Sequence, residues 1–391
     1  MSEPQTFLAY CDKMFTPSEN FIPRGYSGFD RLRPIYIGHT IHGPVPAGAQ
    51  VIDLNTLHGP GGMHGFKQFG WVSKALKHRL KALNPIAIHA SFGKSGAYAL
   101  PLAQALKLPL AVTYYGGDAT KTANTKDSLF RVYNRRRQRL WDRADLILPC
   151  SDFIRRELLA HGAPDAKMMV HHNTADPAKF SPGQKQNLLV FAGRWSPKKG
   201  IDTLIEALTQ LGPELSGWTV RLCGNKREGQ RDAFEQSLHD KLNASGLDVE
   251  LAGWVPADQM PQHWAAAKIA CVPSKRAPSG DAEGLPLVCI EAMLSGCAVV
   301  ATRHSGIVEC VRDGKTGYLS DEDDAAALAE NLRTLLHAPE QAERMGEAGR
   351  ALAMEAFNLR TQSLKLQDHL LRIAGQSQNA TDPAEPLKTP L

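Results

Sequence analysis

The feature that most constrains this chain is an alternation of short apolar runs with segments of helical period. Strand-like runs occupy residues 6–10, 34–38, 49–54, 85–89, 109–114 and 145–149. Amphipathic stretches at 66–83 and 95–106 lie between some of them, and a Gly-rich piece at 59–62 is interpreted as a turn. Strands that alternate with helices predict a parallel sheet covered on both faces.

The same alternation starts again near residue 188. Strand-like runs at 188–192, 219–223, 249–252, 269–273 and 298–301 are accompanied by helical patterns at 201–211, 231–245 and 286–295. Residues 321–374 are mostly of helical pattern, and a polar, turn-rich junction lies at 181–187. A chain of 391 residues is long enough for two domains. The sequence therefore predicts an α/β protein with two doubly wound, Rossmann-like domains that face each other across a cleft, where ligands of such sheets bind.

The expected boundaries follow from this pattern. The first domain is placed at 1–183 and the second at 184–358. A C-terminal helix at 359–374 is expected to pack back toward the first domain. The tail at 375–391, rich in proline and small polar residues, is expected to be disordered.

Charge is unevenly divided between the two halves. The net charge of +5 comprises +10 in residues 1–180 and −5 in residues 181–391. Basic residues concentrate at 67–81 and 131–143, where Tyr133 and Trp141 interleave with them. An anionic membrane surface or a phosphorylated acceptor would suit such a half, although a solvated helix face would carry the same charges. Nucleic acid is not an expected partner, because no module that reads it is recognisable.

The composition also indicates the cellular compartment in which the protein is expected. No run of eighteen apolar residues occurs, and the N-terminus lacks a basic region followed by an apolar stretch. The seven cysteines are scattered without a C-x-x-C pair, which favours reduced thiols. These features predict a cytoplasmic protein, with peripheral binding at the inner face of the plasma membrane as an extension of that expectation.

The strongest local motif runs from Glu283 to Met293 and reads E-G-L-P-L-V-C-I-E-A-M. Pro286 suits the first turn of a helix, so the free backbone N–H groups at 284–287 would form an anion site. Glu283 would precede this helix and Glu291 would lie inside it. Carboxylates accept hydrogen bonds from sugar or ribose hydroxyl groups. A capped amphipathic helix with surface acids would give the same local pattern.

A second motif, F-A-G-R-W-S-P-K-K-G at 191–200, follows a strand-like run and precedes a helical one. The end of the strand delivers Arg194 and the start of the helix delivers Lys199. Two cations near a helix start suit a diphosphate, although a basic strand–helix loop is common in α/β proteins.

The two motifs together resemble the C-terminal signature of family 4 of the retaining glycosyltransferases, a family of the GT-B fold. Further segments are similar to this family: 248–256, 269–274, 296–301, 305–309 and 314–317 in the second half, and 18–22, 89–93, 112–120, 151–154 and 172–180 in the first. The resemblance covers about residues 5–370, and the form G-D-A-E-G-L-P at 280–286 is typical of bacterial members that extend exopolysaccharide, capsule or lipopolysaccharide chains.

This resemblance implies a hexosyltransferase that uses a nucleotide-diphosphate sugar, such as a UDP- or GDP-sugar, and a glycan or polyprenyl-diphosphate-linked acceptor. It implies that Arg194 and Lys199 hold the donor diphosphate, that Glu291 binds the ribose and that Glu283 contacts the transferred sugar. The remaining donor-binding positions that it implies are Gly193, Val255, Gly284, Leu285 and Pro286. No metal and no cofactor are expected, and the acidic run at 321–324 is interpreted as a helix start.

The first half departs from the family at one position. The family usually has Thr-aromatic-His-Gly-x-Asp, whereas this chain has T-Y-Y-G-G-D at 113–118, so that Tyr115 replaces the histidine and Asp118 is kept. Both are candidate catalytic residues, with the sugar specificity altered by the tyrosine. The candidate acceptor-side residues are Ser18, Glu19, His89, Arg135 and Arg136, although His89 would equally suit a structural role.

Two other functions share these sequence features. A sugar-nucleotide epimerase of the GT-B fold is one, but it normally lacks the paired motifs in this form. A GT-B scaffold without turnover is the other, and Tyr115 is the residue that favours it.

Overall fold

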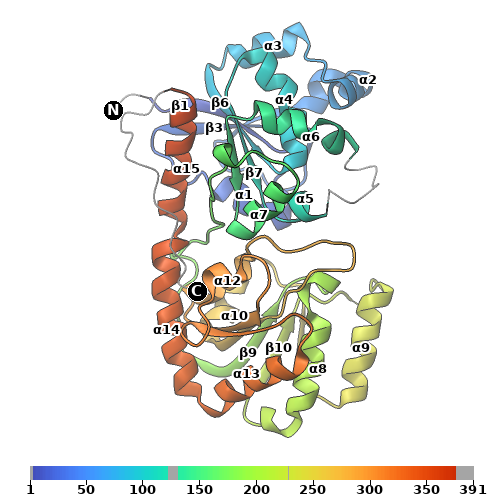
Figure 1. Cartoon of the computed structure of the whole chain (residues 1–391), viewed down its shortest axis with the longest axis vertical. Coiled ribbons are helices and arrows are strands. Elements are labelled where there is room, and N and C mark those ends of the chain that lie inside the picture. Colours follow the sequence, from blue (N-terminus) through green and yellow to red (C-terminus); the bar gives the residue numbers. More distant parts are fainter. Residues whose placement is uncertain (1–2, 122–130, 228, 376–391) are drawn as a thin grey trace.

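The computed structural model describes residues 3–121, 131–227 and 229–375, and the predicted disordered tail lies outside these residues from 376 onward. Two α/β domains are stacked along the long axis of the molecule, and the last two helices run along one side of both (Figure 1). Each domain is built on a six-stranded parallel sheet, which confirms the predicted pair of Rossmann-like domains.

The N-terminal sheet has the strand order β5-β3-β1-β6-β7-β8. Its strands are β1 (Gln5–Tyr10), β3 (Leu32–Gly38), β5 (Gln50–Asp53), β6 (Pro85–Ser91), β7 (Leu110–Tyr114) and β8 (Leu146–Pro149). The short strands β2 (Lys13–Met14) and β4 (Thr40–Ile41) pair beside it. The helices are α1 (Phe21–Arg24), α2 (Leu54–Phe69), α3 (Lys74–Lys81), α4 (Gly93–Leu106), α5 (Gly117–Thr120), α6 (Arg131–Arg143) and α7 (Asp152–Ala160).

The C-terminal sheet has the order β11-β10-β9-β12-β13-β14. Its strands are β9 (Gln186–Ala192), β10 (Thr219–Cys223), β11 (Glu250–Gly253), β12 (Ala267–Val272), β13 (Ala298–Thr302) and β14 (Gly317–Ser320). Around it lie α8 (Ile201–Leu211), α9 (Ala233–Ser245), α10 (Met260–Ala266), α11 (Leu287–Leu294), α12 (Ile307–Cys310), α13 (Ala325–His337) and α14 (Pro339–Ala356). Strand β14 was not predicted from the sequence.

The region after β5 differs from its prediction. The helix expected at 66–83 is two helices, because Gly70 has a φ of +76° and ends α2, after which the Ser73 hydroxyl caps α3 by accepting from the Leu76 N–H. Helix α2 already begins at Leu54, where Asp53 caps it. The Gly-rich piece at 59–62, expected as a turn, lies inside this helix.

The last helix, α15 (Leu359–Ile373), returns to the N-terminal domain. Gln367 Oε1 accepts hydrogen bonds from the backbone N–H groups of residues 30–32, at 2.8 to 3.0 Å. Leu366 and Leu370 pack into the same apolar core as Phe7 of β1. Burying a leucine side chain contributes about 1.5–3 kcal/mol, so α15 fastens the two domains together.

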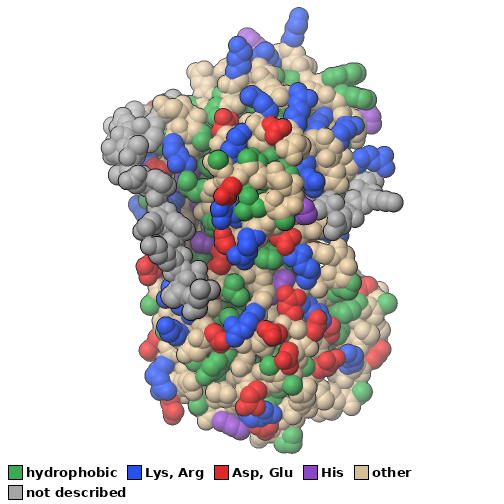
Figure 2. Space-filling model, viewed as in Figure 1, with side chains coloured by type: hydrophobic (Ala, Val, Ile, Leu, Met, Phe, Trp, Pro, Cys, Tyr) green, Lys and Arg blue, Asp and Glu red, His purple; other side chains and the backbone are tan. Residues whose placement is uncertain are grey.

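The surface reflects the division of charge. Lys and Arg side chains dominate the visible face of the N-terminal domain, and acidic side chains are more frequent on the C-terminal domain (Figure 2). All seven cysteines are buried and free. Within the described residues, no helix has both the length and the apolarity needed to cross a bilayer.

Candidate active site

The segment before α11 lies directly against the N-terminal domain. A Cβ atom on Gly284 would stand 2.1 Å from the Tyr115 carbonyl oxygen and 2.5 Å from Cys150 Sγ. The Gly284 carbonyl accepts hydrogen bonds from the Ser151 hydroxyl at 3.1 Å and from the Gly306 N–H at 2.8 Å. Only glycine permits this approach, so the contact fixes the position of Glu283 relative to both domains.

Glu283 meets two lysines that come from the loop after β9. Its Oε1 lies 3.2 Å from Lys199 Nζ and 3.4 Å from Lys198 Nζ. Burial alone would raise the pKa of Glu283, but the two ammonium groups lower it to about 2. The carboxylate is therefore ionised at neutral pH and holds both cations in place. Lys198, which also lies 3.4 Å from Asp281 Oδ1, was not singled out in the sequence.

The loop that carries these lysines is shaped by two glycines. A Cβ on Gly193 would lie 3.4 Å from the aliphatic chain of Lys199, which therefore packs over this residue. Gly200 has a φ of +64°, and a Cβ there would stand 1.7 Å from the Pro273 carbonyl oxygen. Arg194 is exposed and forms no ion pair within the described part of the chain, so its guanidinium remains available to a ligand.

The second glutamate lies one turn inside α11. Burial raises the pKa of Glu291 to about 7, an effect opposed by nearby Trp264, Arg24 and Lys199. Arg24, whose positive charge lowers the pKa of Glu291, belongs to α1 of the other domain.

Two of the other predicted donor-binding residues stand at the start of α11, and a third lies in another loop of the same domain. Pro286 caps α11, and Leu285 is buried, with its carbonyl accepting from Asn173 Nδ2 at 2.8 Å. Val255 is half-buried in the loop after β11. The structure thus gathers both predicted motifs at one place.

The Asp118 side chain is bound within its own domain. Its carboxylate accepts hydrogen bonds from the backbone N–H groups of Gly93, Tyr115 and Gly116, at 2.9 to 3.1 Å. Burial raises the pKa of Asp118, and these three bonds oppose the shift. These bonds shape the loop against which Gly284 packs, and the predicted catalytic role of Asp118 stays a prediction.

The Tyr115 side chain turns away from Glu283 into the N-terminal domain. Its ring packs edge-on against Phe21 and Phe92, each with a centroid distance of 5.0 Å. Burial raises the pKa of Tyr115. The ring lines a cavity of about 40 Å³ that it shares with His89 and His172. This volume holds one or two water molecules and is too small for a sugar in this conformation.

The candidate acceptor-side residues do not form one surface. His89 is held inside the domain, where Nδ1 contacts the Tyr26 hydroxyl at 2.9 Å and Nε2 contacts the Thr113 hydroxyl at 2.7 Å. Burial lowers the pKa of His89 to about 4. Both of its ring nitrogens are thus engaged inside the domain.

Two further pairs from the acceptor-side prediction lie elsewhere. Ser18 is exposed and Glu19 half-buried in a short 3-10 turn, Pro17–Glu19. Arg135 and Arg136 donate to the Gln68 carbonyl, and Arg136 also donates to the Ala97 carbonyl at 3.0 Å. These arginines fasten α6 to α2 and α4.

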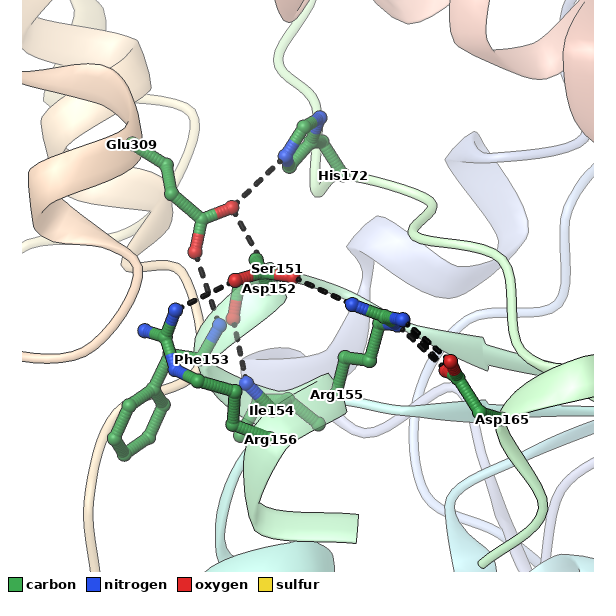
Figure 3. A network of polar contacts seen from close by, with 9 residues as sticks. All are labelled: Ser151, Asp152, Phe153, Ile154, Arg155, Arg156, Asp165, His172 and Glu309. Carbon is green, nitrogen blue, oxygen red and sulfur yellow. Dashed lines mark hydrogen bonds and ion pairs between the residues drawn. The ribbon is translucent and has the colours of Figure 1, made fainter. Parts of the chain in front are cut away.

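A carboxylate bridge joins the two domains beside Gly284. Glu309 of α12 accepts from the first N–H groups of α7, those of Asp152 at 2.9 Å and Phe153 at 3.1 Å (Figure 3). His172 Nε2 lies 3.1 Å from the same carboxylate. An acid at a helix start is favoured by the helix dipole, so this contact stabilises the observed domain arrangement.

His304 is a site residue that the sequence did not single out. The Glu283 N–H points at His304 Nε2 at 3.4 Å, and His304 Nδ1 lies 2.6 Å from Glu322 Oε1. Its only sequence signal is its place beside Ser305. Among the described residues, no group of three or more His, Cys, Asp or Glu side chains could hold a metal ion.

Two glycosyltransferase domain models match the chain one after the other. The model described as glycosyl transferase 4-like domain matches residues 23–174, and the one described as glycosyl transferases group 1 matches residues 173–352. The second match contains both motifs of the site.

Curated relatives are similar over part of the chain. WcaL of Salmonella typhimurium, a glycosyltransferase assigned to colanic acid biosynthesis, is 31% identical over 62% of this chain and 59% of its own length. The amylovoran biosynthesis glycosyltransferase AmsK of Erwinia amylovora is 28% identical over 72% of this chain and 69% of its own. The chain thus spans somewhat under two thirds of the first of these relatives.

Solved structures share the fold at low identity. Sucrose-phosphate synthase of Thermosynechococcus elongatus superposes with a TM-score of 0.72 at 19% identity, over 95% of this chain and all of the other. HepE of Anabaena, solved in complex with UDP, gives 0.73 at 20% identity over 94% of this chain and all of its own. Both likenesses show the GT-B arrangement of two facing domains.

Proposed function

The chain belongs to the glycosyltransferases whose two domain models it matches, and from this premise we propose that it transfers a hexose from a nucleotide-diphosphate sugar to a glycan or a lipid-linked acceptor in the synthesis of a cell-surface polysaccharide. The transfer retains the anomeric configuration. The bond that breaks joins the sugar's anomeric carbon to a diphosphate oxygen, and the new bond joins that carbon to an acceptor hydroxyl oxygen, whose proton passes to the departing diphosphate.

One observation carries this proposal. Lys198 and Lys199 stand together over Glu283, at the start of α11 and against the other domain. A diphosphate that leaves with growing negative charge is stabilised by such cations, since they are positioned before the reaction begins. Arg194, exposed on the same loop, adds a third positive charge.

In this proposal, the two glutamates bind two parts of the donor other than the diphosphate, namely the hexose and the ribose. Glu283 contacts the hexose, because it precedes the helix start and faces the neighbouring domain. Glu291 binds the ribose hydroxyl groups from inside α11. The names of similar proteins support such a donor: HepE was solved with UDP, and a mycobacterial relative is named a GDP-mannose-dependent mannosyltransferase.

The diphosphate is neutralised without a metal ion in this proposal. Lysines 198 and 199, Arg194 and the N–H groups at the start of α11 supply the positive charge that a divalent cation would otherwise bring. Turnover should therefore persist in excess EDTA. Loss of turnover that added magnesium or manganese restores would contradict this point.

An anionic membrane surface is the proposed location of the acceptor. Phe69 and Trp71 are stacked at 5.4 Å and are exposed by 63% and 68%, beside the Gln68 carbonyl that binds Arg135 and Arg136. Aromatic side chains next to cations suit a lipid interface. Replacing Phe69 and Trp71 with serine should reduce binding to vesicles of anionic lipid. Unchanged binding to these vesicles would contradict the proposed contact with an anionic membrane.

A screen of nucleotide sugars tests the function. A donor that binds the folded chain raises its melting temperature by mass action, so the correct donor should stand out from the others. The products formed from that donor then separate the classes of function. A transferase releases nucleoside diphosphate and slowly hydrolyses the sugar, an epimerase returns an isomeric nucleotide sugar, and a scaffold returns the donor unchanged.

A further inference from the structure

A buried charge cluster lies at the carboxyl edge of the N-terminal sheet, outside the site described above. Asp12, two residues after β1, has three partners from three other segments. His39 Nδ1 lies 2.5 Å from Asp12 Oδ1, Lys67 Nζ lies 3.1 Å from the same oxygen, and Lys94 Nζ lies 3.2 Å from Oδ2. Asp12 follows β1 and His39 follows β3. Lys67 lies in the last turn of α2 and Lys94 in the first turn of α4, so these residues come together only in the folded chain.

The cluster carries more positive than negative charge. Burial lowers the pKa of His39, so this imidazole is neutral at physiological pH, and one carboxylate faces two ammonium groups. Burial alone would raise the pKa of Asp12, but His39 and both lysines hold it well below its usual range. The net charge of the cluster is therefore about +1.

Both lysine side chains keep part of their surface exposed. The side chains of Lys67 and Lys94 are exposed by 29% and 23%, whereas that of Asp12 is exposed by 12% and that of His39 by none. Both lysines also lie over the ring of Tyr98, at 5.4 and 5.8 Å from its centre. An ammonium group has three donors, and Asp12 uses one on each lysine. The arrangement is a pair of fixed cations with donors left for an anion.

The cluster is also close enough to the candidate active site for one acceptor molecule to contact both. In the strand register Tyr10 pairs with Ala90 and Ala90 pairs with Val112, so Asp12 is level with the end of β7. Two strand spacings, about 10 Å, separate it from the loop where Tyr115 meets Gly284. A molecule about the length of two sugar residues would reach from one place to the other.

We propose that Lys67 and Lys94, held by Asp12 and His39, form a binding subsite for a phosphate or diphosphate group of the acceptor. This inference rests on the proposed function, in which the C-terminal domain binds the donor and the N-terminal domain binds the acceptor. Lys67 precedes the exposed pair Phe69 and Trp71 by two and four residues, so an anion bound there lies next to the proposed membrane contact. The phosphate comes either from a lipid-linked acceptor or from a soluble phosphorylated glycan.

Inorganic pyrophosphate is the probe that tests the subsite apart from turnover. In the full chain with Arg194→Ala and Lys199→Ala, the donor site is weakened and calorimetry should still detect pyrophosphate binding. Adding Lys67→Met and Lys94→Met should weaken that binding about tenfold or more, since charge-assisted hydrogen bonds are lost. Lys74→Met with Lys81→Met is the matched control, because both lysines are exposed on or beside α3 and the charge change is equal.

The outcomes decide between a ligand site and a purely structural ion cluster. Conservative Lys67→Arg with Lys94→Arg should restore pyrophosphate binding if the cations face a ligand, provided that thermal unfolding shows a folded chain. Absence of pyrophosphate binding in the donor-site variant, or an equal loss in the control, would overturn the subsite and leave the donor proposal untouched.

A second measurement distinguishes the two sources of phosphate. Vesicles of a neutral lipid to which phosphatidic acid has been added should bind in competition with pyrophosphate if the group is lipid-linked, whereas vesicles of the neutral lipid alone should not. Binding of pyrophosphate without such competition indicates a soluble phosphorylated acceptor.

Discussion

The two sides of the domain interface are built in different ways. On the C-terminal side, Lys199 and Glu283 come from two loops that each carry a local motif, and their charged atoms meet at 3.2 Å. On the N-terminal side, Asp118 and His89 use their polar atoms on their own domain. The cations there, Lys67 and Lys94, are joined only by tertiary folding. The proposed donor site can thus be recognised from short stretches of sequence, whereas the proposed acceptor subsite is apparent only in the folded structure.

The largest expected effect on turnover comes from removing a cation on the C-terminal side of the interface. We expect Lys199→Ala to lower turnover about 10²–10³-fold, a loss typical of removing one group that stabilises developing charge. Lys315→Ala, an exposed lysine of the same domain, is the matched control for steady-state kinetics. Near-normal turnover of Lys199→Ala would show that the leaving group lies elsewhere.

The contact between the two sides is tested at Gly284. A Cβ at this position would press on the Tyr115 carbonyl oxygen of the other domain, so we expect Gly284→Ala to force the interface apart. Overpacking of this kind reduces the free energy of unfolding by about 1–3 kcal/mol, and turnover should fall as well. Gly349→Ala is the control, because its nearest neighbour would be 3.7 Å away. A Gly284→Ala chain with normal stability and kinetics would mean that the domains do not meet here in solution.

The difference between the two sides also explains what the sequence could predict. The fold and the donor loops follow from strand and helix periods and from two contiguous motifs, and the family resemblance is confirmed. Lys198 and His304 were missed because their significance depends on where Glu283 lies. The three backbone N–H groups that bind the Asp118 carboxylate could not be predicted, because they meet it only in the folded loop. The helix break at Gly70 depends on a backbone conformation that composition alone did not show.

The division of labour within the donor side can be sharpened with the two glutamates. We expect Glu291→Gln to weaken binding of the free nucleoside diphosphate about tenfold, because a carboxyl group that accepts hydrogen bonds from the ribose hydroxyl groups is lost. Glu283→Gln should spare free-nucleotide binding and lower turnover. Calorimetry with the nucleotide and kinetics with the sugar donor measure the two effects. Equal losses of nucleotide affinity in both variants would contradict the assignment.

A further expected effect is a dependence of stability on pH. The pKa of Glu291 rises from 4.5 to about 7 on folding, so the folded state holds this proton more tightly than the unfolded state. The resulting stabilisation is fully present below pH 4.5 and is lost as pH rises toward 7. Glu291→Gln should flatten this part of the curve of unfolding free energy against pH. An unchanged slope would show that Glu291 ionises normally in the folded chain.

The most direct test of the whole account is to follow a stabilising nucleotide sugar by mass spectrometry and NMR, with the wild-type chain and with Lys199→Ala. The account predicts that the wild-type chain, without added metal, releases nucleoside diphosphate and a sugar of retained anomeric configuration, and that Lys199→Ala does so far more slowly. Recovery of an isomeric nucleotide sugar, inversion at the anomeric carbon, or equal rates in the two chains would contradict it.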